Sequence, residues 1–171
     1  MVSIVGSLTP VKAHEVFFQA ASRVLAEQPA LFVIVGDGPL LSRHKRSAHD
    51  LGIGQQVKFT GEVSKPRVDE ILSVTDIGVL TSDTEGMSNA LLDFMLHSKP
   101  VIATDVGGNR EVVDHGRTGI LVPPRDESAV STALLSLLTN LDKAVEMGRQ
   151  GRCRIEALFS REGMLHSLES L

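Results

Sequence analysis

The chain contains no tryptophan and no tyrosine, so phenylalanine alone supplies its aromatic residues. A lectin-like platform of stacked aromatic rings is therefore not expected. The single cysteine, Cys153, excludes an internal disulfide framework and favours a reducing compartment. No apolar run approaches the length of a membrane span, and the apolar run that begins at Val2 leaves no room for a signal peptide. These features predict a cytoplasmic protein.

Charge of one sign is not in large excess either. Lysine and arginine number 17 against 21 acidic residues, and the net charge of −4 gives no reason to expect a nucleic-acid partner. The length of 171 residues suits one domain with a sizeable core. The sequence therefore predicts that residues 1–171 form a single domain.

Short apolar runs alternate with amphipathic stretches along the chain. The runs cover residues 2–5, 31–35, 57–60, 77–80, 101–104 and 120–122, and each is too short for a helix. Helical periodicity covers residues 14–28, 40–51, 67–74, 90–97, 109–113, 128–138, 141–159 and 161–171. Such alternation predicts an α/β fold: a Rossmann-like, doubly wound parallel sheet of about six strands with helices on both faces, followed by C-terminal helices.

Several helix starts carry recognisable signals. Proline follows Thr9, Gly38 and Lys65, at positions where a missing N–H costs nothing in the first turn. Asp126 and Ser160 are suited to accept hydrogen bonds as N-caps.

The ligand crevice of such a sheet lies where the winding reverses. If the strand order is 3-2-1-4-5-6, as the fold type suggests, this point lies between the carboxyl ends of strands 1 and 4. The loops of residues 6–12 and 81–89 follow these strands and should face each other.

The segment from Glu85 to Asp93 is the most informative in the chain. Its two carboxylates lie eight positions apart, one in the loop and one two turns into the following helix, so both can face the same side. Backbone N–H groups at the helix start are free to meet an anion. Free amides flanked by acceptors suit a phosphorylated, hydroxyl-rich ligand such as a sugar nucleotide.

Three side chains near this crevice have both a functional and an ordinary interpretation. Lys12, at a helix start, would neutralise a diphosphate, or else is a solvated surface lysine. Glu85 could bond sugar hydroxyls or stabilise positive charge at an anomeric carbon, or is an acid favoured by the next helix dipole. Asp93 could accept from a ribose diol, or is a surface helix residue.

Other motifs carry weaker signals. The glycines at 107 and 108 permit either close approach of a ligand or an ordinary turn, and residues 36–39 resemble the start of a dinucleotide fingerprint without its third glycine, which favours a turn. Asp83 and Glu85 have no further ligand spaced to complete a metal site, and the histidines show no ligand spacing, so no metal is expected. Cys153 lies among arginines that could lower its pKa, but an ordinary helix thiol is favoured.

With these residues in view, the chain resembles the C-terminal, nucleotide-sugar-binding domain of a family 4 glycosyltransferase of GT-B architecture. The matching strings lie in family order at residues 5–12 (VGSLTPVK), 34–39 (IVGDGP), 57–61 (VKFTG), 85–92 (EGMSNALL), 99–108 (KPVIATDVGG), 111–113 (EVV) and 118–124 (TGILVPP). They span nearly the whole chain, so the match is specific for the family and not for the substrate.

The resemblance implies retaining transfer from a nucleoside diphosphate sugar, without a bound metal or other cofactor. Lys12 would hold the diphosphate, and Glu85 would be the catalytic residue, close to the sugar. Asp93 occupies the position of the family's second glutamate, on the ribose. The remaining donor-binding positions are Gly6 and Ser7 beside the phosphates, Val57, Lys58 and Phe59 along the base, and Gly86, Met87, Ser88 and Asn89 at phosphate or sugar oxygens.

Three positions depart from the family pattern. Ser7 stands where an arginine is usual, which removes half of the diphosphate clamp. Asp93 is one methylene shorter than the usual glutamate. Ala13 replaces a glycine after the lysine.

The resemblance also implies a missing partner. GT-B enzymes bind the acceptor on an N-terminal domain, and this chain would be only the donor half, separated from that domain or truncated. We therefore expect a glycosyltransferase of the hexosyltransferase type in two-domain form, with the isolated chain inactive, and any membrane association would come through the absent domain. Half of a sugar-nucleotide epimerase and a non-catalytic nucleotide-binding module are the alternatives.

Overall fold

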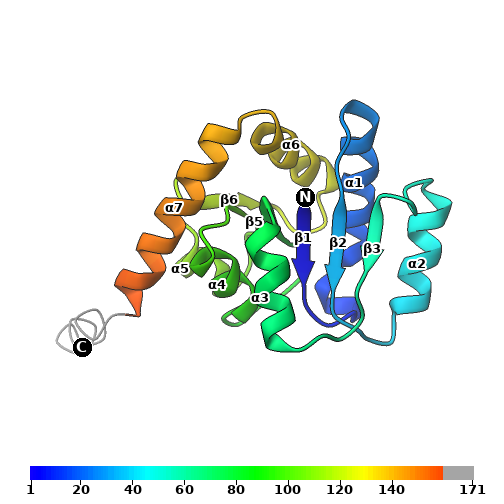
Figure 1. Cartoon of the computed structure of the whole chain (residues 1–171), viewed down its shortest axis with the longest axis horizontal. Coiled ribbons are helices and arrows are strands. Elements are labelled where there is room, and N and C mark those ends of the chain that lie inside the picture. The colour runs from blue at the N-terminus through cyan, green and yellow to red at the C-terminus, as the bar shows by residue number, and fades with distance from the viewer. Residues whose placement is uncertain (160–171) are drawn as a thin grey trace.

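The computed structural model describes residues 1–159, in which six parallel strands form one sheet of order β3-β2-β1-β4-β5-β6 (Figure 1). The strands are β1 (Val2–Val5), β2 (Phe32–Val35), β3 (Val57–Phe59), β4 (Ile77–Leu80), β5 (Val101–Thr104) and β6 (Gly119–Val122). The doubly wound fold and the strand order assumed from the fold type are both confirmed.

Helices connect the strands and close the chain. They are the 3₁₀ turn η1 (Pro10–Lys12) and the α-helices α1 (His14–Glu27), α2 (Leu41–Asp50), α3 (Lys65–Val74), α4 (Asn89–Leu96), α5 (Asn109–Val112), α6 (Glu127–Leu138) and α7 (Leu141–Leu158). Their ends fall within about two residues of those that periodicity predicts. The helix expected over residues 161–171 and the N-cap expected at Ser160 lie outside the described residues.

Alternation along the strands divides the core into two layers. Side chains such as Ile4, Ile34 and Val79 pack with α1, α2 and α6 on one face. Their neighbours, such as Leu80 and Val101, pack with α4, α5 and α7 on the other, while Val33 and Val35 meet α3. Both faces are covered, which is why the strands read as continuous apolar runs.

Two of the three predicted proline starts are confirmed. Pro10 and Pro66 lie in the first turns of η1 and α3, where no N–H is needed. Pro39 instead precedes α2, which begins at Leu41, so the Gly38-Pro39 pair belongs to the turn before the helix. The predicted cap of α6 is present, because Asp126 Oδ1 accepts from the N–H of Ala129 at 2.8 Å.

Within residues 1–159, no helix combines the length and the apolar character that crossing a membrane would require.

Candidate functional site

The loops after β1 and β4 lie side by side, as the sequence predicts. β1 and β4 are paired neighbours in the sheet. Across the gap between them, the N–H of Asp83 donates to the carbonyl of Val11 at 2.8 Å, and Thr81 Oγ1 donates to the carbonyl of Lys12 at 3.0 Å. The two loops are therefore fixed to each other at the point where the winding reverses.

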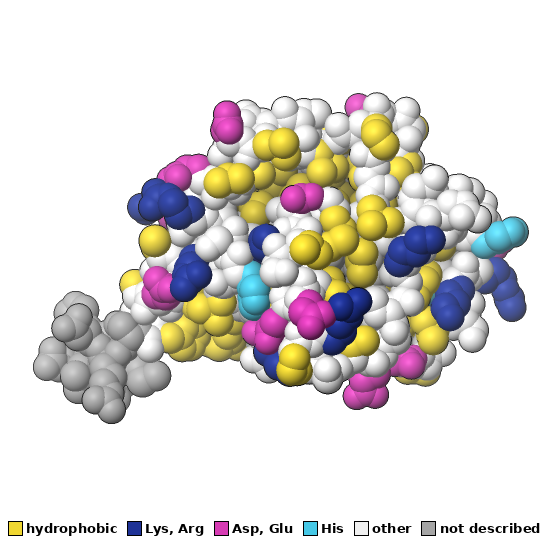
Figure 2. Space-filling view, viewed as in Figure 1, with side chains coloured by type: hydrophobic (Ala, Val, Ile, Leu, Met, Phe, Trp, Pro, Cys, Tyr) yellow, Lys and Arg dark blue, Asp and Glu magenta, His cyan; other side chains and the backbone are white. Residues whose placement is uncertain are grey.

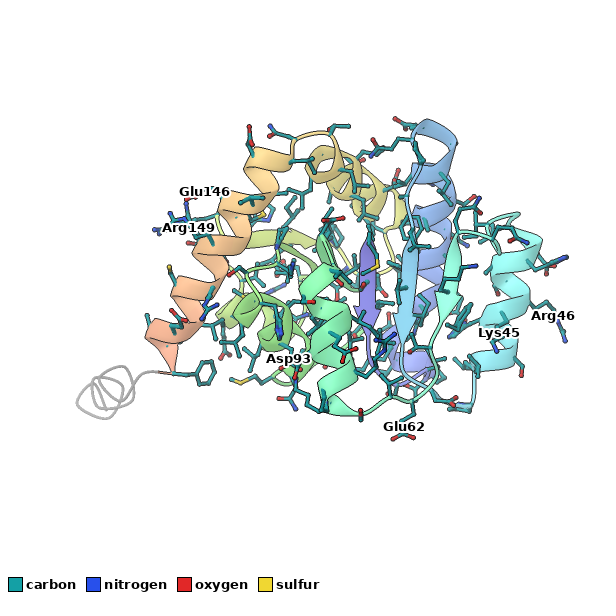
Figure 3. The ribbon with its side chains drawn as sticks, viewed as in Figure 1. Lys45, Arg46, Glu62, Asp93, Glu146 and Arg149 are labelled. Carbon is teal, nitrogen blue, oxygen red and sulfur yellow. The ribbon has the colours of Figure 1, made fainter. Side chains whose placement is uncertain are left out.

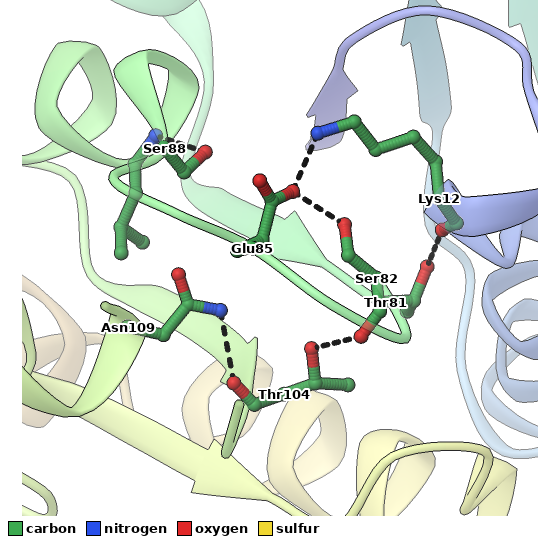
Figure 4. A network of polar contacts seen from close by, with 8 residues as sticks. Lys12, Thr81, Ser82, Glu85, Ser88, Thr104 and Asn109 are labelled. Carbon is green, nitrogen blue, oxygen red and sulfur yellow. Dashed lines mark hydrogen bonds and ion pairs between the residues drawn. The ribbon is translucent and has the colours of Figure 1, made fainter. Parts of the chain in front are cut away.

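Lys12 and Glu85 meet where these two loops lie together (Figure 4). Lys12 Nζ lies 2.5 Å from Glu85 Oε1, and Ser82 Oγ donates to the same oxygen at 2.6 Å. The side chains of Glu85 and Lys12 are only 9% and 22% exposed. Among the described residues, Glu85 Oε2 has no partner, so this oxygen is available to a ligand.

A chain of buried hydrogen bonds supports the loop that carries Glu85. Thr104 Oγ1, at the end of β5, donates to the carbonyl of Ser82 at 2.6 Å, and Asn109 Nδ2 donates to the carbonyl of Thr104 at 2.9 Å (Figure 4). Ser82, Thr104 and Asn109 are all fully buried. Buried hydrogen bonds of this kind hold a loop in one position, although Asn109 Oδ1 itself has no partner among the described residues.

The start of α4 leaves several backbone donors free. Ser88 caps the helix, with its Oγ accepting from the N–H of Leu91 at 3.4 Å. Within residues 1–159, the N–H groups of Met87, Ser88, Asn89 and Ala90 have no hydrogen-bond partner. Free donors at a helix N-terminus favour an anion.

Glycines from neighbouring loops pack against the loop after β1 and the loop after β4. A Cβ added at Gly36 would lie 2.1 Å from the carbonyl oxygen of Gly6, and one added at Gly38 would lie 2.6 Å from that of Leu8. Contacts this short are incompatible with a side chain. The turn predicted for residues 36–39 therefore supports the loop after β1.

The loop after β4 is supported in the same way. Added Cβ atoms at Gly107 and Gly108 would lie 1.8 Å and 2.3 Å from the carbonyl oxygens of Glu85 and Gly86. The N–H of Gly108 donates to Gly86 O at 3.1 Å. The interpretations left open for these glycines were close approach of a ligand and an ordinary turn. The structure shows close approach of a neighbouring protein loop instead.

The residue after Lys12 has an unusual backbone. Ala13 has φ = 45° and ψ = 43°, in the left-handed region that favours glycine. A glycine, which the resemblance implies at this position, would adopt this conformation at lower cost. His14, which follows, is buried against His44 with ring centroids 5.2 Å apart, and neither ring has a hydrogen-bond partner in the described part of the chain.

Asp93 belongs to a different set of contacts. It is the fifth residue of α4, one turn from the helix start rather than the predicted two. Its Oδ2 lies 2.8 Å from Lys65 Nζ at the start of α3, and its side chain is 29% exposed. Figure 3 shows Asp93 beside α3. No contact joins Asp93 to Glu85 within residues 1–159, so the structure holds the two carboxylates separately.

The other predicted positions differ in exposure. Ser7 and Met87 are exposed, and Gly6 leaves room for Lys12, whose Cε would lie 3.9 Å from an added Cβ. Lys58 is exposed on β3, the edge strand, whereas Val57 is buried.

Phe59, the last residue of β3, is half-buried against Phe18. In the described chain, none of the three β3 residues contacts Lys12 or Glu85.

Several contributing residues had no predicted role in the site, among them Thr81, Thr104 and Asn109 in the hydrogen bonds described above. Ser82 binds Glu85, and Lys65 binds Asp93. Asp83, considered above only as a metal ligand, forms a two-point ion pair with Arg125 from the loop after β6. No group of three or more potential metal ligands comes together in residues 1–159. The sequence marked Lys65 only as a helix start, because Pro66 follows it, and gave no sign that Lys65 binds Asp93.

Comparison with known proteins gives consistent matches. The sequence pattern of the family described as "Glycosyl transferases group 1" matches residues 1–140. A GDP-mannose-dependent alpha-(1-6)-phosphatidylinositol monomannoside mannosyltransferase of Mycobacterium tuberculosis is 35% identical over 130 residues, which are 72% of this chain and 34% of that protein. N-acetyl-alpha-D-glucosaminyl L-malate synthase of Bacillus anthracis is 29% identical over 167 residues, covering 98% of this chain and 43% of the enzyme. The chain thus spans less than half the length of these relatives.

Solved structures share the fold. Anabaena HepE in complex with UDP superimposes with a TM-score of 0.87 at 21% identity, over 99% of this chain and 48% of that one. The C-terminal domain of LpcC, a glycosyl transferase group 1 family protein of Francisella tularensis, gives a TM-score of 0.86 at 23% identity, over 94% of this chain and 86% of that domain.

Proposed function

Because this chain belongs to the group 1 glycosyltransferases, we propose that it is the donor half of a retaining glycosyltransferase and binds a nucleoside diphosphate sugar. The observation that carries the proposal is the Lys12–Glu85 pair at the reversal of the sheet, beside the free N–H groups of α4. A cation and backbone donors suit phosphates, and a carboxylate oxygen without a partner suits a sugar hydroxyl.

In this proposal the phosphates lie between Lys12 and the start of α4. Lys12 supplies a point charge that offsets the negative charge of the leaving diphosphate. The N–H groups of Met87, Ser88 and Asn89 donate to phosphate or sugar oxygens. Because these donors are fixed by the fold, they need little reorganisation when the sugar–phosphate bond breaks.

Glu85 is proposed to act on the donor sugar. Its Oε1 is held by Lys12 and Ser82, which leaves Oε2 to accept from a sugar hydroxyl. A carboxylate fixed at this position also stabilises positive charge that develops at the anomeric carbon. Asp93 is proposed to accept from the ribose, and the loop after β3 to lie along the base.

We propose that the acceptor is bound by a second domain, as the coverage of the relatives suggests. The relatives named above are more than twice as long as the segment they share with it. Without a second domain, the reacting groups would be neither positioned nor shielded from water. We therefore propose that the 171-residue chain binds the donor but does not transfer sugar efficiently.

Titration calorimetry tests the proposal directly. UDP and GDP are titrated into the chain, followed by UMP and GMP. At least one diphosphate should bind more tightly than its monophosphate, because only the diphosphate spans Lys12 and the start of α4. Equal affinities for both members of each pair would reject the diphosphate site.

A non-catalytic nucleotide-binding module is the second candidate, and the serine at position 7 favours it because the usual arginine is absent. Joining the chain to an acceptor domain from a relative distinguishes the two. Transfer of sugar by the joined protein supports an enzyme, whereas tight donor binding without transfer supports a module.

A further inference from the structure

A closed ring of polar contacts joins α3 to α4 beside the proposed donor site. Lys65 Nζ lies 2.8 Å from Asp93 Oδ2 and 3.2 Å from Asp69 Oδ1. His97 completes the ring, with Nε2 3.7 Å from Asp69 Oδ1 and Nδ1 2.8 Å from the backbone carbonyl of Asp93. Figure 2 shows acidic, basic and histidine side chains lying close together over α3 and α4.

The ring fixes Asp93 at two points. A carbonyl oxygen can only accept, so His97 Nδ1 donates to it, and the side chain and backbone of Asp93 are both engaged. Lys65 is held in turn by the two carboxylates. Partial burial lowers the pKa of Lys65, but its hydrogen bonds to Asp93 and Asp69 outweigh this effect and raise it above the ordinary value.

One oxygen of Asp93 is left for a ligand. Lys65 occupies Oδ2, whereas Oδ1 has no partner among the described residues. An aspartate reaches less far than a glutamate, so its free oxygen serves a ligand only if the carboxylate plane is turned correctly. An ion pair with Lys65 on one oxygen fixes the orientation of the carboxylate plane.

We propose that Lys65 is a positioning residue for the nucleotide, holding Asp93 Oδ2 so that Oδ1 accepts a hydrogen bond from a ribose hydroxyl. This inference rests on the proposed function, because Asp93 needs positioning only if a nucleotide binds. Lys65 thereby contributes to the choice of ribonucleotides over deoxynucleotides without touching the ligand.

The test compares the chain with Lys65→Met and Lys65→Arg. The nucleoside diphosphate that the unmodified chain binds more tightly, UDP or GDP, is titrated together with its 2′-deoxy and 3′-deoxy forms. Lys65→Met should lower the preference for the ribonucleotide by about three- to tenfold, since a well-placed bond to a charged group is weakened. Lys65→Arg should restore most of that preference, because it keeps a donor on Oδ2.

Lys45→Met is the matched control. Lys45 is an exposed lysine on α2, remote from Asp93 in Figure 3, and makes no ion pair within residues 1–159. It should leave the ribose preference unchanged. Lys65 is itself more than half exposed, so its loss is compatible with folding, and Lys65→Gln gives a second variant of similar length.

The outcomes separate the inference from the proposed function. If Lys65→Met weakens the ribo and both deoxy forms equally, or tightens binding, Lys65 does not position Asp93 and the inference is overturned. In either case a retained preference of the unmodified chain for diphosphate over monophosphate leaves the proposed function standing. Loss of the ribose preference alone, with the diphosphate preference intact, supports the inference.

Discussion

Lys12 and Glu85 are 73 residues apart in the sequence, yet they form a part-buried ion pair of 2.5 Å across the two central strands of the sheet. Each comes from the loop that follows its strand, and each is the residue expected to meet a different part of one donor. The pair therefore joins the proposed phosphate and sugar positions into one site.

The roles of the two carboxylates should separate on substitution. Asp93→Asn should weaken binding of the plain nucleoside diphosphate by about 1–3 kcal/mol if its ribose partner is left unpaired. Glu85→Gln keeps an amide oxygen available beside Lys12 Nζ, so it should change binding of the plain diphosphate less than Asp93→Asn does and weaken mainly the sugar-bearing form. Calorimetry of both variants with both ligands measures this. Equal losses for the plain diphosphate would mean that the loop is a general anion site.

Ser7→Arg should strengthen diphosphate binding. An arginine at this exposed position adds charge-assisted bonds of about 1.5–3 kcal/mol when well placed, and the gain should shrink at high salt. Gln55→Arg, an exposed position before β3, is the control for added charge. Unchanged affinity in Ser7→Arg would show that position 7 does not face the phosphates.

Gly108→Ala should damage the site through backbone contact alone. The added methyl would lie 2.3 Å from the carbonyl of Gly86, so the loop that carries Glu85 must move. We expect a loss of about 1–3 kcal/mol in unfolding free energy and weaker diphosphate binding. At Gly54 the nearest atom is 3.7 Å away, so Gly54→Ala is the matched control. Equal behaviour of the two variants would contradict the proposed packing.

Stability should decline in acid because of a buried imidazole. Burial, with His44 and Lys12 nearby, lowers the pKa of His14 to about 3 from 6.5. At pH values between these two pKa values, the imidazole is protonated in the unfolded chain and neutral in the folded chain. Lowering the pH therefore reduces the free energy of unfolding, by up to about 1.4 kcal/mol per pH unit.

Urea unfolding at several pH values between 7 and 4, roughly the range of this titration, measures how steeply the free energy of unfolding changes with pH. His14→Leu should flatten it, whereas His49→Leu should not, because the side chain of His49 is 88% exposed. A slope that is unchanged in His14→Leu would assign the acid sensitivity to other groups.

Ser98→Gly should stabilise the protein. Ser98 follows α4 with φ = 56°, in the left-handed region where glycine ends helices at least cost. The gain should be about 1 kcal/mol in thermal or urea unfolding. Ser98→Ala removes the same hydroxyl but keeps the Cβ, so it should bring no gain. If both variants behave alike, the backbone at this position carries no strain.

The sequence predicts the strands and their loops well because each strand is a short, largely apolar run between turn residues, and β2, β4 and β5 are buried throughout. The run at residues 77–80 coincides with β4, and that at residues 101–104 coincides with β5. The strand order followed from the fold type, and the meeting of the two crevice loops followed from that order.

Contacts between distant side chains were beyond this reasoning. Periodicity placed Asp93 on a helix but could not show that Lys65, 28 positions earlier, holds it. Spacing among the histidines gave no signal for the His14–His44 contact, because it forms between two helices rather than along one. The glycines at 107 and 108 were left between two interpretations, since their neighbours, the carbonyls of Glu85 and Gly86, are defined only by the folded loops.

The contacts of Gly36 and Gly107 have a consequence for how such a site diverges. Both crevice loops rest on main-chain atoms of a neighbouring loop, so the frame of the site does not depend on which side chains point into it. If the proposed site is correct, we expect substitutions at exposed positions such as Ser7 or Met87 to change which ligand is recognised while the backbone frame stays in place. A lineage built on this frame would then change its ligand one residue at a time, without passing through a misfolded ancestor.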